Sequence, residues 1–338
     1  MIDDSTQLPS SLGADMAAVA LGRLDHALQA DDVWQAWMTV SLVDEALGST
    51  ARDGYHIATA DFLFWLESAR GLGSGALTWE GFQVARDAYR GTQSCARLPH
   101  RMPDDQVLYT IADRMLLGDD GGTYQHDRYQ GRMDNWQAAA ARIRAEHRGL
   151  DAAGRLVRSF HELQPVGPRM SFALARALVP LFLQLSLGLN RPGPWISADL
   201  DARGVKRTAL GLTGPSTTAV DGYQEVAVKG TDAFWHTFFA RTVASAADRG
   251  VERVRRVSRV LSRLEERVRP GRAGGLLDRV RPHLTSVPVF AKRDVARWAG
   301  AGDHTAEKLC RDLVSTGLIE EMSGRKRYKL YWIPDLWW

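Results

Sequence analysis

The feature that most constrains the fold is one long helical pattern over residues 232–268. Its apolar residues recur at alternating steps of four and three, which is the spacing of a heptad seam on one face of a helix. The other faces carry many arginines. The pattern predicts one long helix that supplies either rigidity or a homodimer contact through 235–268. The seam consists of Val243, Ala247, Gly250, Val254, Val257, Leu261, Leu264 and Val268.

Helical spacing also covers most of the chain before this helix, so we predict a mainly α fold with strands only near the C-terminus. Residues 95–102 and 165–168, rich in proline with arginine or glycine, predict loops. Residues 270–275 (PGRAGG) predict an interdomain linker. The predicted helices cover 14–28, 33–47, 60–69, 79–89, 105–117, 134–148, 151–163 and 171–189.

Composition excludes several classes of protein. Cys95 and Cys310 are the two cysteines and form no Cys-x-x-Cys pair, which disfavours zinc ribbons, iron–sulfur sites and redox pairs. This usage fits a reducing compartment. The longest apolar stretch, over 177–189, is shorter than the roughly 20 residues that a membrane span needs. We therefore expect a soluble, cytoplasmic protein without membrane contact.

The small net charge of +3 hides an uneven distribution of charge along the chain. Residues 1–150 hold 21 acidic and 13 basic side chains, a balance of −8. Residues 151–338 hold 19 acidic and 30 basic side chains, a balance of +11. Two explanations remain open: the basic part contacts a polyanion, or the two halves attract each other.

The segment 276–338 predicts a separate module. Its pattern reads as short helices over 276–284, 292–299 and 303–314, then two strands over 318–322 and 325–333, with an extended segment at 287–290. Two helices joined by a tight turn and followed by a basic-tipped hairpin are the order of a winged helix-turn-helix domain. On the third helix, Ala306, Leu309, Cys310 and Leu313 share one face and should pack inward.

The outward residues of this module predict contacts with double-stranded DNA. A helix-turn-helix places its second helix in the major groove, and a cationic hairpin neutralises phosphates or enters a minor groove. Glu307, Glu320 and Glu321 oppose this prediction, because acidic groups repel phosphate. A protein contact and a plain packing module remain the alternatives. The candidate DNA-binding residues are His304, Thr305, Lys308, Arg311, Arg325, Lys326, Arg327 and Lys329.

Residues 173–200 resemble part of a Fic-domain protein, in which the signature His-Pro-Phe-x-x-Gly-Asn-Gly-Arg-x-x-Arg leads into an apolar helix and a Pro-rich turn. Residues 45–54 are similar to the Ser-Ser-x-Ile-Glu-Gly segment of many members. Residues 232–268 are similar to the long helix that follows the catalytic core, and members often end in a winged helix. The resemblance implies a Fic-like helical bundle over 1–270, followed by a small winged helix-turn-helix domain over 276–338.

The resemblance also implies a chemistry, the transfer of AMP or another phosphate-containing group to a protein hydroxyl, with the signature His as general base. The stretch that corresponds to the signature, 164–176, departs from it. Gln164 stands in place of the base, and Ser171-Phe172-Ala173 replaces Asn-Gly-Arg, so that only Arg176 remains. His161 is either a displaced base or an ordinary helix residue. His161, Arg169 and Arg176 form a possible vestigial nucleotide pocket.

These observations predict a DNA-binding regulatory protein with a catalytically degenerate Fic-like body. We expect no catalytic residues, no cofactor and no metal site. Two alternatives stay open: a Fic-type nucleotidyl or phosphate-group transferase with a nonstandard site, and a helical subunit that binds a protein partner.

Overall fold

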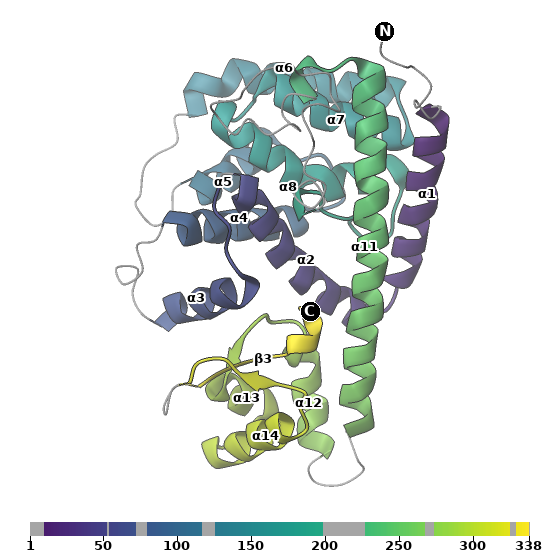
Figure 1. Ribbon diagram of the computed structural model, residues 1–338. Coiled ribbons are helices and arrows are strands. Elements are labelled where there is room, and N and C mark those ends of the chain that lie inside the picture. Colours follow the sequence, from purple (N-terminus) through teal and green to yellow (C-terminus); the bar gives the residue numbers. More distant parts are fainter. Residues whose placement is uncertain are drawn as a thin grey trace. The chain divides into compact units, whose positions relative to one another are not determined.

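The computed structural model describes residues 10–52, 54–71, 80–116, 126–198, 227–267, 274–324 and 329–337 (Figure 1). Within these residues the chain is mainly α-helical, as the sequence predicts. The helices are α1 (Ser10–Ala27), α2 (Asp31–Arg52), α3 (Thr59–Gly71), α4 (Glu80–Ala96), α5 (Asp105–Leu116), α6 (His126–Glu146), α7 (Gly149–Leu163), α8 (Pro168–Leu187), α11 (Asp232–Arg267), α12 (Gly274–Leu284), α13 (Lys292–Ala299) and α14 (Asp303–Ser315).

Most predicted helices are found close to their predicted bounds, and the differences have local causes. The helix predicted to start at 171 starts at Pro168, because proline at the first helical position loses no hydrogen bond and Gly167 precedes it with φ of 83°. α4 continues through Cys95 into a region predicted to be a loop. Of the predicted linker at 270–275, residues 270–273 lie outside the described residues.

The chain divides into two compact units, and α2 and α11 contribute residues to both. The first unit comprises residues 1–26, 44–56 and 83–250. Its core forms where α7 packs along α8 and α6 packs along α7. Trp136 meets Phe160 edge-on at a ring distance of 4.8 Å and lies 6.4 Å from Phe182. All three of these rings are fully buried, so they anchor α6, α7 and α8 to one another.

α8 is the most apolar helix in this core. By length and composition, residues Met170–Leu187 could cross a membrane, but 72% of that segment is buried inside the chain. A core helix of a soluble protein has this property, because it must be apolar on every side that meets a neighbour. Pro180 lies inside α8, and its carbonyl accepts a hydrogen bond from the backbone N–H of Gly193 at 3.3 Å.

The second unit comprises residues 27–43, 57–82 and 251–338, and it includes a C-terminal module, residues 274–337. This module contains α12, α13, α14 and an antiparallel sheet of β1 (Phe290–Ala291), β2 (Glu320–Glu321) and β3 (Leu330–Trp332) in the order β1-β3-β2. The register pairs Phe290 with Tyr331 and Glu321 with Tyr331. The predicted strands 318–322 and 325–333 are therefore found in shortened form.

Aromatic packing holds this small module together. Phe290 lies 6.1 Å from the ring of Tyr331 and 5.7 Å from that of Trp298, and Trp298 stacks on His283 at 5.2 Å. The N-terminus of α13 is closed by Asp294, whose carboxylate accepts a hydrogen bond from the backbone N–H of Ala291 at 2.9 Å. These contacts join α12, β1, α13 and β3 into one core.

The predicted heptad seam is buried within a single chain. Each of its described residues, from Val243 to Leu264, has little or no exposed surface. Gly250 is required by close packing, because a methyl group there would lie 2.9 Å from the side chain of Leu24. A homodimer through 235–268 would therefore have to use other faces of α11 than the seam.

Candidate functional site

The candidate site is the outward side of α14 together with the hairpin that follows it. α14 presents a buried face through Ala306, Cys310 and Leu313, while Leu309 is half-buried. Burial raises the pKa of the Cys310 thiol to about 11, so it is an inert packing group. The predicted inward face of this helix is confirmed.

The opposite face of α14 is open to solvent. His304, Thr305, Lys308 and Arg311 are all exposed, as is Glu307 between them. Lys308 forms no ion pair with any described residue, whereas Arg311 Nη2 lies 3.5 Å from Glu307 Oε1. This face therefore offers one cation, Lys308, without an ion-pair partner among the described residues, and two further hydrogen-bonding side chains, His304 and Thr305.

A second ion pair fixes the start of α14 against α13. Lys292 Nζ lies 3.1 Å from Asp303 Oδ2, and this hydrogen bond to Asp303 is the first cause of a raised pKa at Lys292. Asp303 is the first residue of α14, and Gly302 occupies the N-cap position. The acidic group is still placed favourably, because a carboxylate in the first turn interacts well with the helix dipole.

The hairpin is closed by side chains at its base. Ser323 Oγ accepts a hydrogen bond from the backbone N–H of Leu330, and Met322 N–H donates to the Leu330 carbonyl at 3.0 Å. Lys329 is exposed and its Nζ lies 2.6 Å from Glu321 Oε2. The predicted tip residues Arg325, Lys326 and Arg327 lie outside the described residues.

The residues predicted for a vestigial pocket lie elsewhere, in the first unit. Arg176 is buried, and its Nε donates to Ser197 Oγ at 3.0 Å while its Nη2 donates to Ser49 Oγ at 3.0 Å. Ser197 in turn donates from its backbone N–H and its hydroxyl to the carboxylate of the buried Glu45, at 2.9 Å and 2.6 Å. We call Glu45, Ser49, Arg176 and Ser197 the buried polar network.

This network connects α2, α8 and the segment that begins at Ser197. The segment runs directly over α2 at Gly48, where a methyl group would lie 2.6 Å from the backbone nitrogen of Ala198. Buried charges are tolerated only when they are hydrogen-bonded to compensating groups, and here a carboxylate and a guanidinium are linked through one serine. The arrangement explains why charged residues occur at these core positions.

His161 is fully buried beside the network. Its ring stacks on Phe172 at 4.7 Å and meets Trp235 edge-on at 6.4 Å. Burial, and then the charge of Arg176, hold the pKa of His161 well below its ordinary value. A buried imidazole between two rings is a core residue. The side chain of the third predicted residue, Arg169, lies outside the described part of the chain.

His161 is expected to make the folded chain less stable in acid. Its folded pKa is depressed, so below the ordinary value of about 6.5 the unfolded chain binds a proton that the folded chain does not. The contribution is fully present above that pH and is lost at about 1.4 kcal/mol per pH unit as the pH falls. Urea unfolding at about pH 7 and about pH 5 measures it. The control His161→Phe should show a smaller loss, and equal losses would contradict the assignment.

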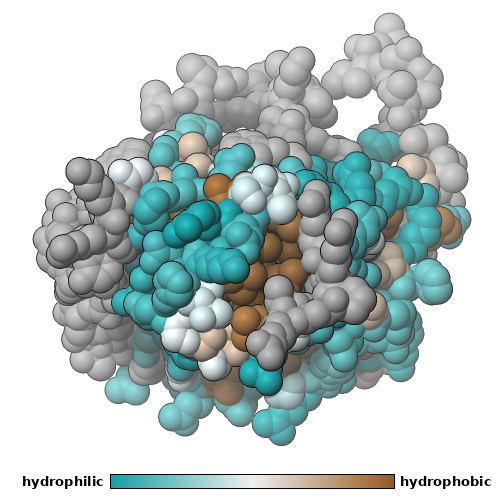
Figure 2. Space-filling view, turned by 90° about the horizontal axis from the view of Figure 1, so that it is seen from below, coloured by the Kyte–Doolittle hydropathy of each residue, from teal (hydrophilic) through white to brown (hydrophobic). Residues whose placement is uncertain are grey.

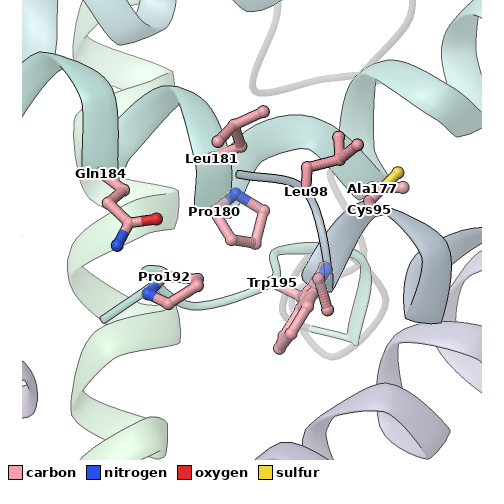
Figure 3. Close-up of a pocket in the computed structure, with 9 residues that line it drawn as sticks. Cys95, Leu98, Ala177, Pro180, Leu181, Gln184, Pro192 and Trp195 are labelled. Atoms are coloured by element: carbon pink, nitrogen blue, oxygen red, sulfur yellow. The ribbon is translucent and has the colours of Figure 1, made fainter. Parts of the chain in front are cut away.

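A small pocket lies in the first unit but does not include His161 or Arg176. It has an empty volume of about 230 Å³, partly open to solvent, and Cys95, Pro180, Gln184 and Trp195 are among its lining residues (Figure 3). Gln184 Nε2 lies 2.7 Å from His100 Nε2. Most of the residues that line it are apolar.

Within the described residues, no three histidine, cysteine, aspartate or glutamate side chains are placed to hold a metal ion. The partners of Arg176 were not predicted from the sequence, because Ser49 and Ser197 are far from it along the chain and carry no motif. Comparison with protein-family models and with curated proteins found no match to this sequence. The Fic-domain resemblance therefore stays a prediction.

Proposed function

We propose that this chain is a DNA-binding regulatory protein and that its C-terminal module is a winged helix-turn-helix domain. The order α12, β1, α13, α14, β2, β3 supports this assignment, as does the sheet order β1-β3-β2. α13 packs against α14, and the β2–β3 hairpin follows directly. In such domains the second helix of the pair enters the major groove.

The observation that carries the proposal is the division of α14 into two faces. Ala306, Cys310 and Leu313 anchor the helix, which leaves His304, Thr305, Lys308 and Arg311 exposed as one surface. Lysine and arginine donate to guanine or phosphate, and a threonine hydroxyl can donate or accept. A rigidly held helix with short polar and cationic side chains on its outer face is suited to reading base edges.

The described part of the module exposes few large apolar side chains, which favours a polar or charged partner over an apolar one. Among the described residues of the module, Val314, with 40% of its surface exposed, is the one large apolar side chain that counts as exposed. Figure 2, the view from below, shows hydrophilic residues around a hydrophobic area in the middle of this face, with further hydrophobic atoms toward one edge. A protein-binding surface normally centres on aromatic or aliphatic anchors.

For the remainder of the chain we propose a Fic-like scaffold without catalysis. The burial of His161 and Arg176 supports this, because a nucleotide would need both groups at an open site. Gln164 forms the left-handed end of α7 and its Oε1 accepts a hydrogen bond from Arg132 at 3.2 Å, a structural role. A cytoplasmic location and domains at 1–270 and 276–338 are parts of the same proposal.

Fluorescence anisotropy with a labelled duplex, titrated with salt, tests this function. The wild-type chain is expected to bind, and changing Arg325, Lys326 and Arg327 to alanine should make the log–log salt slope shallower by about 2 to 3, because each lost phosphate contact removes about 0.9. The matched control changes three exposed arginines of α6, Arg128, Arg142 and Arg144, and should leave the slope unchanged. Absence of wild-type binding at about 50 mM salt would remove the proposal.

A further inference from the structure

The outer side of α14 does not by itself supply the positive charge that a polyanion requires. The helix holds Lys308 and Arg311 but also Asp303, Glu307 and Asp312, a balance of −1. Two of these acids are near Lys292, and Glu307 also pairs with Arg311. Electrostatic affinity for DNA grows with the number of phosphates that the protein neutralises. A duplex bound at α14 therefore needs cations from another element.

The second half of α11 carries such cations in the same compact unit. Residues 251–263 hold five arginines and one glutamate, a balance of +4. On the seam side of this segment the side chains are buried, namely those of Val254, Val257, Leu261 and Leu264. The arginines lie away from the seam; we call Arg253, Arg255, Arg256, Arg259 and Arg263 the α11 arginine stripe.

Two ion pairs connect the stripe's helix to the C-terminal module. Arg263 pairs with Asp335, and Glu265 pairs with Arg281 of α12. All four residues belong to the second unit, so the segment and the module are joined within one compact body. The C-terminal part of α11 is therefore held to the module by ion pairs.

Some arginines of the α11 arginine stripe already form ion pairs within the chain, which compete with binding to a phosphate. Arg255 pairs with Glu252, and Arg263 is engaged by Asp335. Arg256, half-buried, and Arg259, exposed, form no ion pair or hydrogen bond with the described residues. They are three positions apart and so lie on neighbouring parts of the helix surface. A guanidinium offers a planar set of donors that matches a phosphate group.

We propose that Arg256 and Arg259 bind backbone phosphates of the nucleic acid held by the C-terminal module, and so supply affinity that α14 lacks. This inference rests on the proposed DNA-binding function. The contacts would carry no base preference, because phosphate contacts position a duplex without reading its sequence. In this proposal α11 neutralises phosphate charge, and α14 contacts the bases.

The test is a salt titration of binding to a random-sequence 30-base-pair duplex, with the full chain. Arg256→Gln/Arg259→Gln should reduce the slope by about 2 and weaken binding by about tenfold at low salt. The control Arg142→Gln/Arg144→Gln removes the same charge from exposed arginines of α6 and should change neither quantity. Circular dichroism checks that both variants keep their helix content.

The outcomes separate this inference from the function on which it rests. If the wild-type chain binds duplex DNA and the α11 variant shows the wild-type slope, the stripe does not contact phosphate and the inference is wrong, while the proposed function stands. If both variants reduce the slope equally, the effect is one of net charge and the inference is also wrong. If the wild-type chain binds an acidic protein but no duplex, both proposals fail.

Discussion

Replacing Glu45 by alanine is expected to lower the free energy of unfolding by about 3–5 kcal/mol, because it leaves a buried cation without its compensating carboxylate. Glu45 accepts two hydrogen bonds from Ser197, which itself accepts one from Arg176. The substitution removes the acceptor of both bonds at once. Urea unfolding followed by circular dichroism measures the change.

Two further variants distinguish the effect of breaking the buried polar network from the effect of replacing any glutamate by alanine. Glu146, an exposed residue at the end of α6, provides the matched control, and Glu146→Ala should change stability by less than about 0.5 kcal/mol. The double variant Glu45→Ala/Arg176→Met should lose less than the sum of its single variants, because the second substitution removes the uncompensated charge. A loss below about 1 kcal/mol for Glu45→Ala would show that the network does not stabilise the fold.

The second large effect is expected at Trp235, near the start of α11. Its ring is fully buried, stacks on Phe239 at 5.6 Å and donates from Nε1 to the Gly154 carbonyl at 2.9 Å. Trp235→Ala leaves a cavity and removes the hydrogen bond to the Gly154 carbonyl, so we expect a loss of about 3–5 kcal/mol. Differential scanning calorimetry or urea unfolding measures it.

The neighbouring residue offers a sharp control for this prediction. Phe234 precedes Trp235 on the same turn but has 37% of its surface exposed. Phe234→Ala should therefore cost much less than Trp235→Ala, since less apolar area returns to water. Similar losses at the two positions would mean that Trp235 does not anchor α11 to α7.

The helices were predictable from the sequence because their signals are local. Alternating steps of four and three predicted α11 to within a residue of its C-terminal end. Gly300, in the left-handed conformation, follows the last residue of α13, where the prediction placed the turn. Gly188, also left-handed, ends α8 at Leu187, whereas the prediction ran to 189. α4 continues to Ala96, past the buried Cys95, into a segment that the local sequence predicted to be a loop.

Of the candidate site, the sequence predicted only the part that depends on residue spacing within a single helix, α14. The spacing of Ala306, Cys310 and Leu313 set the inward face of α14, and the exposure of Lys308 followed from it. The buried polar network could not be found in this way. Glu45, Arg176 and Ser197 come together through tertiary packing of distant segments, and no periodicity in the sequence pairs them.

The burial of the heptad seam shows a second limit of sequence reasoning. A heptad pattern predicts that one face of a helix is covered, but it does not say whether another chain or the same chain covers it. In this structure Val257 and Leu264 are buried within one chain. Arginines away from the seam, such as Arg259, keep exposed surface for a partner, which is the basis of the inference about Arg256 and Arg259.

Selection of duplexes from a random pool by the full wild-type chain tests the central claim most directly. A winged helix that reads base edges predicts enrichment of one defined motif, and the enrichment should weaken when His304 and Lys308 of α14 are changed to alanine, while binding to bulk duplex largely persists. If the chain retains no duplex above background at about 50 mM salt, the module does not bind DNA and the account is wrong.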